Sequence, residues 1–154
     1  MDFHSYLTGL VDGEGSFLIS FSLRQKRKFG IEPRPSFCIS LHQRDVHVLE
    51  QVRTFLGCGG IRYNSSDGCY KYETRSLDEI VTKIIPHFQK YPLQTSKQKS
   101  FQLFQEICRM MRSNLHLNRE GLIAILELAY QMNNLGARRY QKDFLLKVVN
   151  KMKV

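Results

Sequence analysis

A helix-forming segment near the start of this sequence runs directly into a strand, and two glycines mark the junction. Residues 3–11 suit a helix, Gly13 and Gly15 interrupt it, and apolar and polar residues alternate from Ser16 onward. Because successive side chains of a strand point to opposite faces, the alternation predicts an apolar face made of Phe17, Ile19, Phe21 and Leu23. A helix end and a strand start must therefore lie together in the folded chain.

The same arrangement of one helix and two strands is predicted twice. Residues 25–35 are basic and contain two prolines, so they predict a loop, and a second strand follows with Phe37, Ile39 and Leu41 on its apolar face. Asp45 is a candidate N-cap for the next helix. Spacing and turn signals then predict a helix over 45–55, strands over 61–64 and 69–75 joined by a hairpin turn, and a helix around 80–88.

Helices dominate the rest of the chain. After the break at Tyr91-Pro92, apolar spacing predicts helices over 96–112, 119–133 and 138–152. The order αββαββ predicts an α+β fold with a four-stranded antiparallel sheet, helices on one face and additional C-terminal helices. We expect one domain over residues 1–154, with a core over about 3–112 and C-terminal helices over about 113–154. The basic residues of this last part, Arg138 among them, predict a solvated positive face.

Basic residues outnumber acidic ones. The chain has 23 Lys and Arg against 14 Asp and Glu, a formal net charge of +9 that is spread along the sequence. Such an excess suits a polyanionic partner, and a solvated basic surface is the alternative. The solvent face of the predicted sheet would be polar, basic and shaped like a ribbon that fits a DNA groove; it would carry Ser20, Ser22, Arg24, Lys26, Arg62, Asn64, Lys71 and Arg75.

Signals for secretion, membrane insertion and disulfide bonding are missing from the sequence. The N-terminal residues lack a basic segment followed by an apolar one, and no run of 18 apolar residues occurs. The four cysteines are far apart and form no C-x-x-C pair: Cys38, Cys58, Cys69 and Cys108. We expect reduced cysteines, no membrane partner, and a soluble intracellular protein in the cytoplasm of a prokaryote or in an organelle.

The stretch Leu7-Thr8-Gly9-Leu10-Val11-Asp12-Gly13-Glu14-Gly15 points to chemistry. Gly9 and Gly13 share one face of the helix, and without Cβ atoms there a second helix can approach closely. If that helix belongs to a second subunit, twofold symmetry brings two Glu14 carboxylates together. Paired carboxylates suit hard cations such as Mg²⁺, which activate water beside phosphate groups. For an isolated turn of this kind, a polar helix exit is the alternative.

This nine-residue string resembles the LAGLIDADG motif of the homing endonucleases. It matches at Leu7, Gly9, Asp12, Gly13 and Gly15, and Glu14 keeps a carboxylate where the usual motif has Asp. The predicted αββαββ order over about 3–104 is also the order of that family's core. Two further positions match, Gln43 at a strand end and Lys97 after the second αββ unit.

The resemblance implies a role for each residue. Glu14 would ligate metal through its carboxylate and Gly13 through its carbonyl oxygen, while Lys97 would stabilise charge on the scissile phosphate. Gln43 would organise water, and Arg44 is a further candidate for phosphate contact, with an exposed helix-start arginine as the alternative. The helix interface would include Leu7, Gly9, Leu10, Asp12 and Gly13, with Asp12 in a structural role. Mg²⁺ is the expected cofactor, and Mn²⁺ the expected substitute.

A single motif supplies half of such a site. Family members of this type work as homodimers on nearly palindromic double-stranded DNA, here expected to span roughly 20 base pairs. The residues expected to contact DNA are Ser20, Ser22, Arg24, Lys26, Arg27, Lys28, Arg34, Ser40, His42, Arg62, Asn64, Lys71, Arg75 and Lys99. The function expected is site-specific, metal-dependent cleavage of DNA. Two alternatives stay open: an RNA maturase that binds its intron RNA, and a DNA-binding regulator without activity.

Overall fold

The computed structural model describes residues 1–132 and 138–151. They form two compact units: the first unit comprises residues 1–17 and 36–98, and the second comprises residues 18–35 and the described residues from 99 onward. The expectation that residues 1–154 form one domain stays a prediction. In the described ranges, no helix is long and apolar enough to cross a membrane.

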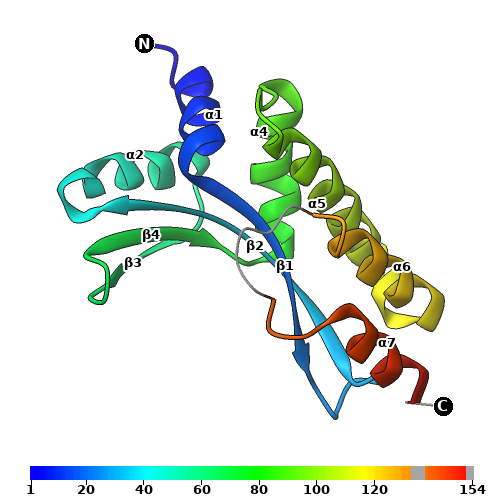
Figure 1. Ribbon diagram of the computed structural model, residues 1–154. Helices are drawn as coiled ribbons and strands as arrows, with labels where there is room; N and C mark the ends of the chain where they lie inside the picture. The colour runs from blue at the N-terminus through cyan, green and yellow to red at the C-terminus, as the bar shows by residue number, and fades with distance from the viewer. Residues whose placement is uncertain (133–137, 152–154) are drawn as a thin grey trace. The chain divides into compact units, whose positions relative to one another are not determined.

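The elements follow the predicted αββαββ order, and further helices come after them (Figure 1). The two αββ repeats consist of α1 (Phe3–Glu14), β1 (Gly15–Leu23), β2 (Ile31–His42), the short η1 (Gln43–Asp45), α2 (Val46–Leu56), β3 (Gly60–Asn64) and β4 (Cys69–Thr74). The helical elements after them are α3 (Leu77–Glu79), η2 (Ile80–Ile84), α4 (Ile85–Lys90), α5 (Lys97–Arg112), η3 (Leu115–Leu117), α6 (Arg119–Ala129) and α7 (Lys142–Lys151). The last residue of the helix predicted over 119–133 and the last residue of the helix predicted over 138–152 lie outside the described residues.

The junction between α1 and β1 is fixed by local contacts. Asp2 caps the start of α1, where its carboxylate accepts hydrogen bonds from His4 N at 3.1 Å and from Ser5 Oγ at 2.7 Å. At the other end, the backbone of Gly15 is extended and its N–H donates to the carbonyl of Val11. A Cβ at position 15 would lie 2.6 Å from a Val11 side-chain carbon. Glycine at this position therefore lets the helix pass straight into the strand, as predicted.

The four strands lie in the order β1-β2-β4-β3, and β4 is antiparallel to both of its neighbours. Tyr72 and Thr74 of β4 are buried, so the alternate residues Lys71 and Glu73 point to the opposite face. Figure 1 shows α1 and α2 on one side of the strands of the first unit. The predicted α+β class with its four-stranded antiparallel sheet is confirmed.

Three phenylalanines form the centre of the first unit. The ring of Phe17 lies 5.2 Å from that of Phe37 and 5.4 Å, edge to face, from that of Phe88, measured between centroids. All three side chains are at most 4% exposed. Burial of each contributes roughly 1.5–3 kcal/mol, and edge-to-face contacts add to this. The predicted apolar faces of β1 and β2 thus meet the amphipathic helix predicted around 80–88.

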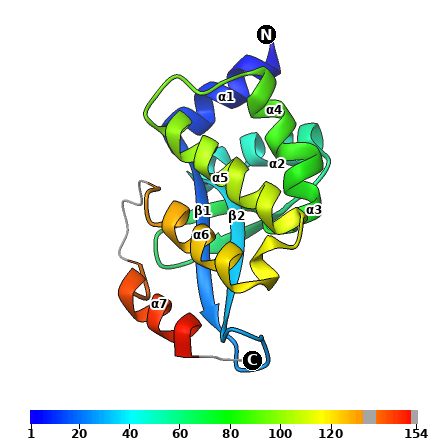
Figure 2. The same ribbon diagram turned by 90° about the vertical axis from the view of Figure 1, so that its right-hand side faces the viewer.

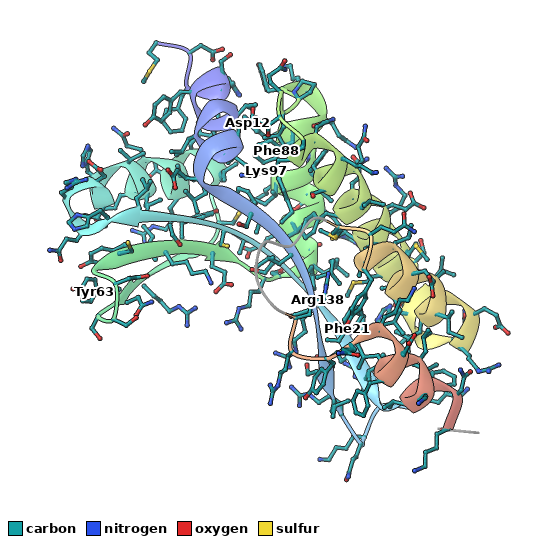
Figure 3. All side chains as sticks on the ribbon, in the orientation of Figure 1. Asp12, Phe21, Tyr63, Phe88, Lys97 and Arg138 are labelled. Atoms are coloured by element: carbon teal, nitrogen blue, oxygen red, sulfur yellow. The ribbon has the colours of Figure 1, made fainter. Side chains whose placement is uncertain are left out.

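The second unit consists of the hairpin over residues 18–35 and the helices from residue 99 onward, which include most of α5 (Figure 2). Arg24 N donates to Gly30 O at 2.8 Å and closes the hairpin. Arg138 donates to the carbonyls of Ile19 and Ala129, each at 2.7 Å, and its guanidinium lies 4.4 Å from the ring centroid of Tyr130 (Figure 3). Arg138 is therefore a structural brace, and the prediction that it belongs to a solvated face is wrong.

Two predictions about the first hairpin are also wrong. β2 begins at Ile31, so half of the loop predicted over 25–35 is strand. In the described chain β4 pairs with β2 only from Phe37 to His42, which leaves Pro33 and Pro35 beside a free edge where the missing N–H disrupts no ladder. Leu23, expected in the core, is 45% exposed because it ends β1 at the hairpin tip.

The helix predicted around 80–88 contains a π-helical turn, η2. Pro86 lies at the second position of α4 and lacks the N–H that a regular helix would use. A local π turn accommodates this break while Ile80, Ile84 and Phe88 stay completely buried. The four cysteines are free, as expected.

Candidate functional site at the end of α1

Glu14 is the last residue of α1 and is exposed. Among the described residues its carboxylate has no hydrogen bond and no ion pair. Gly13, just before it, is exposed as well. Both oxygens of Glu14 are therefore available to an outside ligand.

Lys97 lies at the same helix end. Its Nζ donates to the carbonyls of Val11 at 2.8 Å and Asp12 at 3.1 Å (Figure 3). The Val11 carbonyl also accepts from Gly15 N, and both carbonyls lie at the negative end of the helix, so an ammonium there is favourable. Burial lowers the pKa of Lys97, while the nearby carboxylates of Asp12 and Glu14 act in the opposite direction. One N–H of the ammonium is left for a further acceptor.

Asp12 fastens the loop before α5 to α1. Its carboxylate accepts hydrogen bonds from Gln94 N at 2.9 Å, Thr95 N at 3.1 Å and Thr95 Oγ1 at 2.7 Å. Burial raises the pKa of Asp12, but these bonds and the charge of Lys97 outweigh it and the pKa is lowered. Thr95 Oγ1 in turn accepts from Lys97 N at 3.2 Å. Asp12 and Thr95 thus position Lys97, and the sequence analysis did not identify Thr95.

Gln43 and Arg44 follow directly after β2. Burial, Asp67 and the nearby Glu14 carboxylate raise the pKa of the Cys69 thiol, and Cys69 lies opposite His42 of β2, so Gln43 and Glu14 lie at the same end of the sheet. Gln43 is exposed, and its N–H donates to Gly68 O at 3.0 Å. Arg44 Nε lies 3.8 Å from Asp45 Oδ2 on the surface. The structure brings neither side chain into contact with Glu14 or Lys97.

His42, expected to contact DNA, has a local role at this turn. Its Nδ1 accepts a hydrogen bond from Arg44 N at 3.3 Å and so caps η1. Asp45, the predicted N-cap of α2, makes no side-chain capping bond. The helix prediction is correct, but η1 is inserted before α2, and the side-chain cap at this turn is that of His42 on η1.

The outer face of α1 is uncovered at both glycines. Gly9 and Gly13 are exposed, and a Cβ built on either would meet nothing within 4 Å. Leu10 is half-buried. Leu7, also expected at the helix interface, has its side chain completely buried within the first unit, and its place in an interface stays a prediction.

Most of the residues expected to contact DNA are accessible. The exposed ones are Ser20, Arg24, Lys26, Arg27, Lys28, Ser40, His42, Arg62, Asn64, Arg75 and Lys99, and the half-buried ones are Ser22, Arg34 and Lys71. In the first unit, Ser40, Lys71 and Arg62 lie directly opposite one another on β2, β4 and β3. They form a polar row on the face turned away from Tyr72.

Two acids organise these basic residues, and the sequence analysis missed both. In the second unit, Glu32 lies 2.6 Å from Arg27 and 3.2 Å from Arg34. In the first unit, Glu73 pairs with three basic side chains and accepts a hydrogen bond from Ser36 Oγ at 2.8 Å. Burial raises the pKa of Glu73, but that bond and the basic side chains outweigh it and the pKa is lowered. The alternation of residues along the strands puts both acids on the polar face. Their position between basic residues in the sequence is the feature by which they could have been identified.

The end of α1 carries oxygen donors of the kind that metal ions bind. In the described part of the chain, no three His, Cys, Asp or Glu side chains come together. The oxygen donors at the end of α1 are the Glu14 carboxylate and the Gly13 carbonyl. Oxygen donors of this kind fit a hard divalent cation.

Comparison with known proteins gives a consistent result. The LAGLIDADG endonuclease family model matches residues 7–108. A probable intron-encoded DNA endonuclease of Mycosarcoma maydis is 32% identical over 95% of this chain. The chain spans 53% of the length of that relative and a smaller part of two probable intron-encoded endonucleases of Neurospora crassa.

Solved structures match over nearly the whole chain. The homing endonuclease I-TnaI is 35% identical with a TM-score of 0.84, and the alignment covers 97% of both chains. The archaeal intron-encoded homing endonuclease I-Vdi141I, solved in complex with DNA, is 28% identical with a TM-score of 0.89, covering 97% of this chain and 96% of that one. The chain therefore belongs to the LAGLIDADG endonuclease family.

Proposed function

We propose that the chain is one protomer of a homodimeric, site-specific DNA endonuclease, and that residues 1–154 act as one endonuclease domain. The observation that carries the proposal is the exposed Glu14 carboxylate, which lies beside the uncovered face of α1 and at the helix end that Lys97 caps. A carboxylate without a partner next to an ordered ammonium suits metal-dependent phosphodiester hydrolysis.

The uncovered glycines support a dimer. Because Gly9 and Gly13 have no neighbour within 4 Å of a built Cβ, a second α1 can approach the backbone closely on this face. A twofold contact between two copies would join two copies of Glu14 in one site. I-TnaI and I-Vdi141I match this chain over nearly their full length, which supports a protomer of this size.

Each site residue has a proposed role. Glu14 and the carbonyl of Gly13 would hold Mg²⁺, for which Mn²⁺ substitutes; the bound cation supplies charge stabilisation and lowers the pKa of water. Lys97, held by Asp12 and Thr95, directs its remaining N–H toward a phosphate oxygen. Gln43 orders water at the same end of the sheet, and Arg44 contacts phosphate.

The proposed substrate is a nearly palindromic DNA duplex of roughly 20 base pairs. The polar row of Ser40, Lys71 and Arg62 on β2, β4 and β3 supports groove binding. The structure of I-Vdi141I is described as complexed with DNA. Relatives from Mycosarcoma and Neurospora are named for introns, which supports expression in an organelle or a prokaryote and an intron origin.

Cleavage of a plasmid that carries the intronless host locus tests the proposal. Wild type should cut in Mg²⁺ and bind without cutting in Ca²⁺, and Glu14→Gln should bind but not cut. Glu50→Gln, an equal charge change at an exposed position of α2, is the matched control and should cut normally. If wild type and Glu14→Gln both bind intron RNA and neither cuts DNA, the result would instead indicate a maturase. Sequence-specific DNA binding without cleavage would indicate a regulator.

A further inference from the structure

Glu73 lies at the centre of a cluster on the polar face of the first unit. Its Oε1 lies 3.0 Å from Arg62 Nη2 and 3.3 Å from Arg75 Nε, and its Oε2 lies 3.8 Å from Lys71 Nζ. Ser36 Oγ donates to Oε2 at 2.8 Å. Both carboxylate oxygens are therefore occupied by the protein's own donors.

The exposures within this cluster differ sharply. The Glu73 side chain is 13% exposed, while the side chains of Arg62 and Arg75 are 65% and 59% exposed. The acid thus lies beneath the basic groups, which reach outward from it. Arg62, Glu73 and Arg75 also line an open hollow of about 450 Å³, which leaves room beside the guanidinium groups.

We propose that Glu73 is a positioning residue that sets base specificity: it fixes Arg62 for reading base edges and reduces the attraction of this face for phosphates in general. The proposal rests on the DNA-binding function proposed above. Arg62 donates to Glu73 through Nη2, and its other N–H donors remain for DNA. These donors suit a bidentate hydrogen bond to guanine in the major groove.

Two physical effects lead to the same outcome. An arginine already held in one geometry loses less conformational freedom when it binds, so the correct base pair is favoured. The half-buried negative charge of Glu73 beneath these basic residues opposes every phosphate, and this weakens binding to all sequences alike. A carboxylate at this position therefore increases discrimination at the expense of non-specific affinity.

Selection from a duplex library with roughly 20 randomised base pairs tests the proposal. Wild type, Glu73→Gln and the charge-matched control Glu50→Gln are each used in Ca²⁺, and their affinities for the selected site and for random duplex are measured against salt concentration. We expect Glu73→Gln to bind random duplex about threefold to tenfold more tightly, with a salt slope steeper by about one. The ratio of specific to random affinity should fall about tenfold, with sequence preference lost at a few base pairs.

A double-mutant cycle separates positioning from a general structural effect. Arg62→Met should lose preference at the same base pairs, and adding Glu73→Gln should reduce it no further. If Glu73→Gln is poorly folded, Ser36→Ala removes only the hydrogen bond to the carboxylate and should give a smaller loss of the same kind. Unchanged discrimination in Glu73→Gln, or additive losses in the cycle, would overturn the proposal. A wild type that selects no sequence would instead count against the proposed function itself.

Discussion

The carboxylate of Asp12 accepts three hydrogen bonds from residues 94 and 95, and this makes it the residue on which the position of Lys97 depends. In Asp12→Asn, the new NH₂ group would face an N–H or O–H donor. We expect a loss of about 1–2 kcal/mol in the free energy of unfolding, which urea denaturation measures. Because the pKa of Asp12 is lowered in the folded state, this stabilisation is present above the unfolded pKa of about 3.9 and is lost as the pH falls through the folded value. Asp45→Asn is the control, because the Asp45 side chain makes no capping bond and only a surface ion pair with Arg44. This variant should have the same unfolding free energy as wild type.

His87 makes the free energy of unfolding depend on pH in a higher pH range than Asp12 does. Burial lowers its pKa to about 4, and the positive charge of His4 acts in the same direction. Thr8 donates its single hydroxyl proton to Tyr91 O at 2.9 Å, so the 3.1 Å contact with Thr8 Oγ1 is donated by His87 Nε2. Because its pKa is about 4, His87 is neutral in the folded state near pH 7.

An unfolded histidine takes up a proton near pH 6.5, so the unfolded state is favoured as the pH falls from there toward 4. We expect wild type to lose about 2 kcal/mol of unfolding free energy between pH 7.5 and pH 5 through this residue. His87→Phe, which keeps an aromatic ring among its neighbours, should lack this part of the loss in urea titrations at the two pH values. An equal pH dependence in both proteins would show that His87 does not carry it.

At the scale of elements, Arg138 connects β1 to the end of α6 through two carbonyl groups and the ring of Tyr130. Arg138→Met removes these hydrogen bonds and the cation–π contact but keeps a long apolar side chain. We expect a loss of about 2–3 kcal/mol in unfolding free energy, measured by urea denaturation. Arg139→Met, at an exposed neighbouring position, is the control and should lose less than about 0.5 kcal/mol. Similar losses in both variants would contradict the bracing role of Arg138.

Elements with strong local patterns could be predicted from the sequence, and elements that depend on a neighbour could not. The junction at Gly15 and the strand pair around Asp67-Gly68 follow from residue types alone, because glycine and the turn residues act locally. The early start of β2 was missed because prolines in a strand are acceptable only at a free edge, and the sequence does not reveal which edges are free.

The candidate site divides in the same way. Glu14, Asp12 and Lys97 could be identified from a contiguous motif and one matching position, and the structure brings them to one helix end. Thr95 and Glu73 could not, since their importance depends on partners that are distant in sequence. For Leu7, the motif indicated a helix interface, but the helical turn directs this side chain into the chain's own core.

At the scale of the whole molecule, the proposed enzyme requires two copies of α1 in contact, and the two glycines make this requirement testable. Gly9→Leu places a branched side chain on the uncovered face, where the single chain has open space, so the protomer should still fold. We expect the variant to be monomeric at concentrations where wild type is dimeric, measured by light scattering after size-exclusion chromatography. It should also lose plasmid cleavage, because each copy of Glu14 would lack its counterpart. Gly60→Leu, at another glycine with open space around its Cβ, should leave the dimer intact. A dimeric and active Gly9→Leu would place the contact between protomers elsewhere.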